Sequence, residues 1–109
     1  MAWLLRDGEV LASLRVAESL LARSRGLLGE RGLEGALLLA HTRSVHTVGM
    51  RFAIDVAFLD RDLTVLAVVT LVPFRVALPR RRTRCILEAE AGAFERWGLR
   101  PGQVLGVKQ

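Results

Sequence analysis

The sequence predicts a mostly β protein, a β-rich α+β fold in which seven to eight short strands and two short helices form a small, partly closed barrel or sandwich. The apolar runs are short, turn residues separate them, and only two segments follow a helical period. Hydrophobic residues make up 51% of the 109 residues and charged residues 25%, which excludes a disordered chain. We expect residues 1–109 to form one domain without internal repeats.

The first element is a β-hairpin around Asp7-Gly8. Aspartate followed by glycine between apolar runs is the strongest short turn signal, because both turn positions need a positive φ. A two-residue loop predicts three cross-strand pairs, which are Arg6–Glu9, Leu5–Val10 and Leu4–Leu11.

A helix follows over residues 17–28, where leucines recur at helical spacing before Gly26, Gly29 and Gly32 end the pattern. Residues 36–40 form a short apolar run that fits a buried strand, and residues 44–50 are β-branched and predicted to be extended.

The second hairpin is predicted from residues 55–60 and 63–72, which flank a turn at Arg61-Asp62. Both strands are apolar on both faces, so we expect both to be central in the sheet. Residues 84–89 and 103–107 are further strands, and residues 91–97 form a short helix that Gly98 ends.

The middle of the chain resembles domain-of-unknown-function family 192, in four motifs that occur in the family's order. The residues that carry the resemblance are Arg25-Gly26-Leu27-Leu28, the run at 46–60 that contains Met50 and Ile54-Asp55-Val56, Ile86-Leu87-Glu88-Ala89-Glu90-Ala91-Gly92, and Gly98-Leu99-Arg100-Pro101-Gly102. The resemblance covers about residues 14–107. It implies a small β-rich domain of bacteria and archaea with no established activity.

The chain departs from the family pattern at three places. Around the methionine, Gly49 and Arg51-Phe52 stand where many members of the family have an aromatic residue and Asn-Thr. Ala53 and the residue after it lack the proline that is usual there, and Gln103 replaces the usual aspartate. If the Asn-Thr pair or the aspartate serves a site in the family, this chain has lost it.

Asp55 is the most informative polar residue, because it begins a strand whose two faces are apolar. A carboxylate among aliphatic neighbours needs a partner. The candidate partners near it in the sequence are Arg51, Arg75, Thr47 and His46. Two interpretations stay open, a satisfied carboxylate that holds a turn in place and a polar group in a ligand cleft.

A cleft is predicted where polar residues interrupt the apolar strands. Its candidate ligand-binding residues are His46, Thr47, Met50, Asp55, Arg75 and Glu88. His41 and His46 do not have the spacing of a helical pair of metal ligands, and we expect neither a metal site nor a cofactor. An enzyme that uses His46 and Asp55 as an acid/base pair is the alternative.

The positive charge is concentrated in residues 75–84. The chain has 16 basic and 11 acidic residues, and this segment holds five arginines and no acid. Arg80, Arg81, Arg82 and Arg84 are therefore candidate anion-binding residues. A solvated loop or a strand edge protected by charge is the simpler explanation, and the scarcity of aromatic residues nearby disfavours nucleic acid as the partner.

Cysteine content and hydropathy exclude further classes. The single cysteine, Cys85, excludes an internal disulfide framework, and the apolar residues after it predict an unreactive buried thiol. No apolar run approaches the roughly 18 residues of a membrane span, and residues 1–9 lack the pattern of an export signal, so we expect the cytoplasm. The function predicted is a non-catalytic binding or accessory module for a small ligand or a protein partner.

Overall fold

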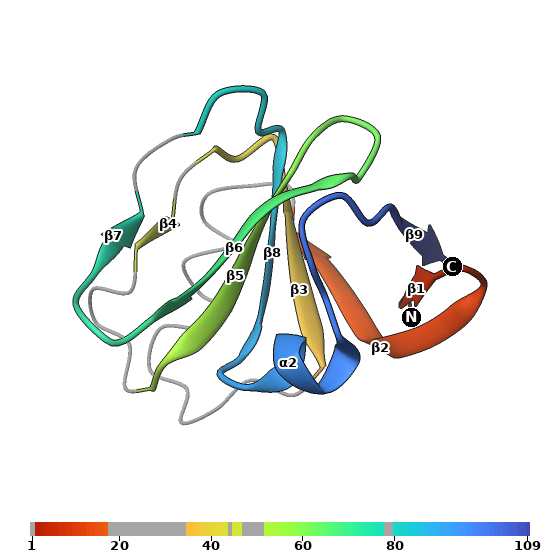
Figure 1. Ribbon diagram of the computed structural model, residues 1–109, viewed down its shortest axis with the longest axis horizontal. Helices are drawn as coiled ribbons and strands as arrows, with labels where there is room; N and C mark the ends of the chain where they lie inside the picture. The colour runs from red at the N-terminus through yellow and green to blue at the C-terminus, as the bar shows by residue number, and fades with distance from the viewer. Residues whose placement is uncertain (1, 18–34, 44, 47–51, 78–79) are drawn as a thin grey trace.

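A curled seven-stranded sheet dominates the computed structural model, which describes residues 2–17, 35–43, 45–46, 52–77 and 80–109 (Figure 1). The order of its strands is β6-β5-β8-β3-β2-β1-β9, and β4 and β7 form a separate two-stranded sheet. The strands are β1 (Ala2–Arg6), β2 (Glu9–Ala17), β3 (Ala36–Ala40), β4 (Val45–His46), β5 (Ile54–Leu59), β6 (Val65–Leu71), β7 (Val76–Ala77), β8 (Cys85–Glu90) and β9 (Leu105–Lys108). The prediction of a mostly β fold is confirmed.

One of the two predicted helices lies in the described part of the chain, as α2 (Ala93–Trp97). It ends at Gly98, whose φ of 65° is left-handed as predicted. The helix predicted at 17–28 and most of the extended segment predicted at 44–50 lie outside the described residues.

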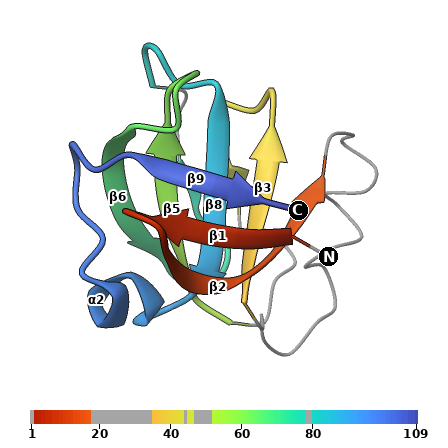
Figure 2. The ribbon, with the colours of Figure 1, turned by 90° about the vertical axis from the view of Figure 1, so that its right-hand side faces the viewer.

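The two ends of the seven-stranded sheet meet at one point. Thr64 and Val104 form an isolated bridge, the N–H of Val65 donates to the carbonyl of Gln103 at 2.8 Å, and the N–H of Leu105 donates to that of Leu63 at 3.0 Å. The sheet therefore curls into a half-barrel that is joined beside the turn between β5 and β6, while α2 lies at the opposite end (Figure 2).

Both faces of the sheet are covered around β5. One apolar cluster includes Ala57, Leu59 and Phe94, and a second cluster on the other face includes Val56 and Phe58. Every residue of β5 is buried, as expected for a central strand. The same expectation is wrong for β6, which is the end strand of the sheet and is mostly half-exposed, because its apolar side chains cover only part of each cluster.

The first hairpin has the predicted turn, with φ of 53° at Asp7 and 80° at Gly8. The pairs Arg6–Glu9 and Leu5–Val10 are confirmed. The pair Leu4–Leu11 is wrong, since the register shifts between Leu4 and Leu5 and Leu4 pairs with Ala12. A bulge in β2 adds one residue there, which bends the strand and helps the sheet to curl.

Gly35 is required where the chain enters β3. Its φ is 73°, and a Cβ atom would lie 2.7 Å from the carbonyl oxygen of Ser13 and collide with the Ser13 hydroxyl. We expect Gly35→Ala to lower the free energy of unfolding by about 3 kcal/mol, because it adds a clash with backbone to the strain of a left-handed alanine.

Gly8→Ala is the matched control, since Gly8 also has a positive φ but a Cβ atom there would meet nothing within 4 Å beyond its chain neighbours. It should cost only the conformational strain, about 1 kcal/mol, in the same urea unfolding experiment. Equal losses for the two variants would contradict the role assigned to the close approach.

Candidate functional site

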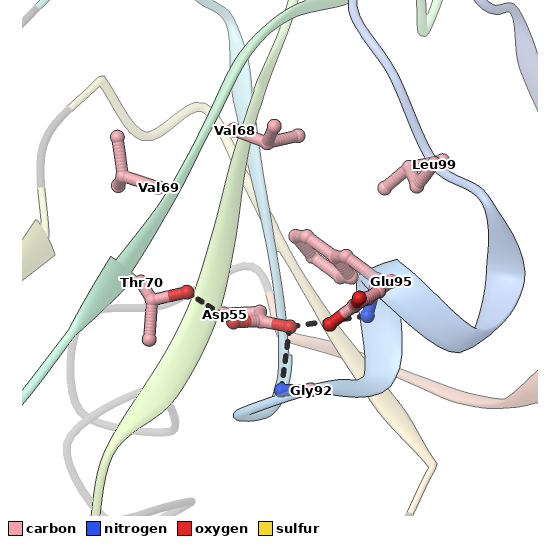
Figure 3. A pocket seen from close by; sticks show the side chains of 8 residues that line it. Asp55, Val68, Val69, Thr70, Gly92, Glu95 and Leu99 are labelled. Atoms are coloured by element: carbon pink, nitrogen blue, oxygen red, sulfur yellow. Dashed lines mark hydrogen bonds between the residues drawn. The ribbon is translucent and has the colours of Figure 1, made fainter.

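Asp55 is a buried carboxylate that joins three elements of the fold (Figure 3). The hydroxyl of Thr70 on β6 donates to its Oδ1 at 2.6 Å, and the N–H groups of Gly92 and Phe94 donate to its Oδ2 at 3.0 Å each. The side chain is only 4% exposed. The prediction of a buried carboxylate with partners is confirmed.

The identity of those partners differs from what the sequence suggested. The candidates were Arg51, Arg75, Thr47 and His46, whereas the hydrogen bonds come from a threonine hydroxyl across the hairpin and from two backbone amides. Arg51 and Thr47 lie outside the described residues. The first N–H groups of a helix have no acceptor within the helix. At α2 these N–H groups donate to Asp55 in place of the cation that the sequence suggested.

The helix α2 depends on Asp55 for its beginning. Its N-cap residue is Gly92, with a φ of 95°, and no side chain of the helix itself caps the N-terminal amides. Asp55, 37 residues earlier in the chain, takes that place. The carboxylate also lies at the positive end of the helix dipole, where negative charge is stabilising.

A hollow of about 390 Å³ lies beside this carboxylate. Its lining comes from β5, β6, α2 and the segment that follows the helix, and consists of Asp55, Val68, Val69, Thr70, Gly92, Phe94, Glu95 and Leu99. Val68 packs on the cluster at one face of the sheet and Val69 on the cluster at the other. Val68, Phe94 and Leu99 belong to the same cluster, so the hollow lies beside β6 on the face of the sheet that α2 covers.

The structure does not bring Asp55 and Glu88 together. In the pairing of β5 with β8, Asp55 lies opposite Ala89 and Glu88 lies opposite Val56. Neighbouring residues of a strand point to opposite faces, so the two carboxylates lie on different sides of the sheet. Glu88 is 2% exposed and belongs to the side of Val56 and Leu37.

The remaining predicted cleft residues are not placed next to Asp55. His46 lies on β4 and pairs with Val76 of β7, while Thr47 and Met50 lie outside the described residues. Arg75 is exposed between β6 and β7, where its Nη1 donates to the carbonyl of Phe74 at 3.4 Å. The ligand-binding and acid/base roles of these residues stay predictions.

No group of three or more histidine, cysteine, aspartate or glutamate side chains with the geometry of a metal site occurs among the described residues.

Cys85 is half-buried at the start of β8 rather than fully buried. In the same ranges of the chain, no helix is long and apolar enough to span a membrane.

The arginines of the basic segment have different surroundings. The guanidinium of Arg80 lies over the ring of Phe58, 4.8 Å from its centroid. Arg81 is exposed. Arg82 and Arg84 line a second hollow, of about 310 Å³, together with Asp60, Arg61 and Asp62 of the turn between β5 and β6. The turn between β5 and β6, which lines this hollow, and α2, which lines the hollow beside Asp55, lie at opposite ends of the half-barrel (Figure 1).

Asp60 holds that turn together. Its Oδ1 accepts the N–H of Asp62 at 2.9 Å and the N–H of Thr64 at 3.0 Å. The hydrogen bond from Thr64, together with that from Asp62 and the positive charge of Arg82, holds the pKa of Asp60 below its ordinary value of 3.8, against an opposing effect of desolvation. The left-handed residue of the turn is Leu63, with a φ of 63°. Asp62, which the sequence placed in the turn, is not left-handed.

Gln103, which departs from the family pattern, is a structural residue in this chain. Its Oε1 accepts the N–H of Arg100 at 3.1 Å and the Nη1 of Arg6 at 3.2 Å, and its Nε2 donates to the carbonyl of Gly98 at 3.1 Å. The bonds with Arg100 and Gly98 close the turn that leads into β9, and the bond from Arg6 joins this turn to β1. A glutamine side chain is longer than that of the aspartate usual in the family, and it reaches both ends of this turn.

The comparisons with known proteins agree on one class, a small conserved β domain whose role is not established. The sequence model of DUF192, described as "Uncharacterized ACR, COG1430", matches residues 2–107. The chain belongs to this family, and the resemblance in its four motifs is confirmed.

Two archaeal proteins are relatives of this chain, and their names state no function. UPF0127 protein PH1112 of Pyrococcus horikoshii is 35% identical over 94 residues, which cover 82% of this chain and 78% of that protein. UPF0127 protein PF1050 of Pyrococcus furiosus is 32% identical over 102 residues, which cover 89% and 88%.

Two crystal structures share the fold. A protein of unknown function from Novosphingobium aromaticivorans has a TM-score of 0.76 and 21% identity, with 96% of this chain and 82% of that chain covered. A putative transcription regulator from Sinorhizobium meliloti has a TM-score of 0.79 and 23% identity, with 97% and 91% covered. At these identities the likeness shows the fold alone.

Asp55→Ala should lower the free energy of unfolding by about 3 kcal/mol, because it leaves two buried amides and a hydroxyl without an acceptor. Asp55→Asn should cost roughly half as much, since one oxygen remains to accept the amides of α2. Urea unfolding measures both losses, and hydrogen exchange at the Phe94 amide reports whether α2 opens. Unchanged exchange at Phe94 in Asp55→Ala would contradict the role of Asp55 as the cap of this helix.

Asp60 makes the stability depend on pH in a defined direction. Its pKa is lower in the folded protein, so its contribution is present above the ordinary value of 3.8 and is lost as the pH falls through the lowered value. In urea unfolding, the difference between the native protein and Asp60→Asn should therefore shrink from pH 6 to pH 3. A difference that stays constant over this pH range would contradict the role assigned to the Asp60 carboxylate.

Proposed function

We propose that this domain is a non-catalytic binding module that holds an extended peptide segment of a partner protein along the edge of β6. The observation that carries the proposal is the hollow beside this strand, whose lining includes three consecutive residues of β6, Val68, Val69 and Thr70. A strand edge offers alternate N–H and C=O groups, which only another extended chain can pair in register.

Much of the outer edge of β6 is unpaired among the described residues, although a bulge at Leu66 interrupts the strand. The strand contains no charged residue and no proline, and its partner on one side is β5. Beyond the bridge at Thr64 and the bonds of Val65, no described residue hydrogen-bonds to the outer edge of residues 66–71. Soluble proteins normally block such an edge with charge, proline or a covering element, and an open apolar edge is a site for strand addition.

The lining of the hollow suits an apolar side chain of such a segment. Val68, Phe94 and Leu99 supply apolar surface, and the volume of about 390 Å³ falls in the range of ligand sites. A peptide strand that pairs with β6 would direct every second side chain toward this hollow.

The charge at the rim favours a basic segment. Glu95 lines the hollow, is exposed, and forms no ion pair among the described residues. The neighbouring arginine of the helix, Arg96, is instead paired with Glu90 at 2.6 Å. A lysine or arginine of the ligand beside the apolar side chain would therefore meet an unneutralised carboxylate.

The surroundings of Asp55 favour binding over catalysis. Its two oxygens accept three hydrogen bonds from groups of the fold itself. A general base needs an oxygen directed at the proton that it removes, whereas these oxygens are directed at Thr70 and at α2.

The test uses heptapeptides with alternating valine and lysine, or alternating valine and glutamate, followed by NMR of the labelled protein. We expect the valine–lysine peptide to shift the amide signals of β6 and α2 and to protect β6 amides from exchange. Glu95→Lys should weaken its affinity about tenfold, because the rim charge is reversed. Glu9→Lys, at an exposed residue of the first hairpin, is the matched control and should change the affinity little.

Two results would contradict the proposal. One is equal binding of the lysine and glutamate peptides, which would leave the rim charge without a role. The other is a concentration-dependent dimer that Val69→Lys abolishes, which would make a second copy of this chain the occupant of the edge.

A further inference from the structure

We propose that the second hollow, between the turn of β5 and β6 and the segment before β8, is a binding site for a small phosphate-containing ligand. Arg61, Arg82 and Arg84 line it. This site lies at the end of the half-barrel away from α2, so the inference is independent of the proposed peptide site (Figures 1 and 2).

The fold brings the two segments together through the backbone. The N–H of Arg84 donates to the carbonyl of Leu59 at 2.8 Å, immediately before the turn that Asp60 closes. Thr83, between the two arginines, is completely buried. Arg82 and Arg84, on either side of it, are both exposed.

The carboxylates in this hollow only partly offset the charge of the guanidinium groups, since the positive charge of Arg82 acts on Asp60. Asp60 and Asp62 line the same hollow, yet none of the three arginines forms a salt bridge with either of them among the described residues. Asp60 uses Oδ1 to hold its own turn. Arg84 donates to the carbonyl of Thr83 at 3.3 Å, which leaves most of its donors available.

The backbone of Arg82 is in a conformation that favours glycine. The N–H of Thr83 donates to the carbonyl of Arg80 at 3.2 Å, which makes Arg82 the third residue of a turn, and its φ is 72°. That turn position with a positive φ is normally glycine. A strained arginine at this place, with its guanidinium at a hollow and no salt bridge among the described residues, points to a role in binding.

The charge and geometry favour a phosphate over a carboxylate. The lining carries three guanidinium groups and two carboxylates, a net charge of +1 (3 − 2). Each guanidinium offers donors in a planar fork, and a phosphate has more acceptor oxygens than the two of a carboxylate. The modest excess of charge fits a small ligand better than a polyanion.

The test is a titration of the labelled protein with inorganic phosphate at low ionic strength, followed by NMR. We expect saturable shifts at the amides of residues 60–64 and 80–84. Arg82→Gly should weaken the affinity about tenfold, because it removes charge-assisted hydrogen bonds. The same change relieves the left-handed strain, so the thermal midpoint should not fall, and loss of binding cannot be a loss of folding.

Arg81→Ser is the matched control, because it removes the same charge from the same turn at a residue outside the lining. It should change the affinity less than about twofold. Asp62→Asn should tighten binding, since it removes a competing negative charge from the hollow.

The inference would be overturned by equal weakening in Arg81→Ser and Arg82→Gly, which would indicate diffuse attraction to the basic segment. Acetate binding as tightly as phosphate would overturn the ligand class. A single-stranded oligonucleotide that binds more tightly than phosphate and is weakened equally by both variants would replace a small ligand with nucleic acid.

Discussion

The hydrogen bonds of one buried carboxylate hold together the end of this molecule where α2 lies. Asp55 lies in the central strand, and its oxygens accept a hydroxyl from β6 and two amides from α2. Because a helix of five residues cannot stabilise itself in water, its position depends on this contact and on the burial of Phe94. The position of α2 in turn creates the hollow at the edge of β6, since three residues of that lining belong to the helix or its N-cap.

The half-barrel is joined at one end and open at the other, which gives the two ends different chemistry. At the joined end, the bridge between Thr64 and Val104 leaves polar turns at the surface, and the arginines gather there. At the other end no bridge joins β6 to β9 among the described residues, and β6 and α2 line an apolar hollow. Because the two ends of the sheet pair only at the bridge between Thr64 and Val104, the same small domain has one polar and one apolar hollow.

The individual strands could be predicted because period and turn chemistry are local. The turn at Asp7-Gly8, the buried runs at 36–40 and 54–59 and the end of the helix at Gly98 all follow from neighbouring residues. The partner of Asp55 could not be predicted in this way. A two-residue turn at 61–62 would have placed Val68 opposite Asp55, whereas a longer turn and a register shift after Phe58 bring Thr70 there.

The amino-acid sequence alone was sufficient to predict the class of fold, the family, the burial of Asp55 and the concentration of positive charge before β8. Which polar groups meet depends instead on how the strands pair. Asp55 and Glu88 lie on opposite faces although both interrupt apolar strands, because strand register and not composition sets the face. Contacts between Asp55 and α2 span 37 and 39 residues, and contacts over such separations are made by the closing of the sheet rather than by any local pattern.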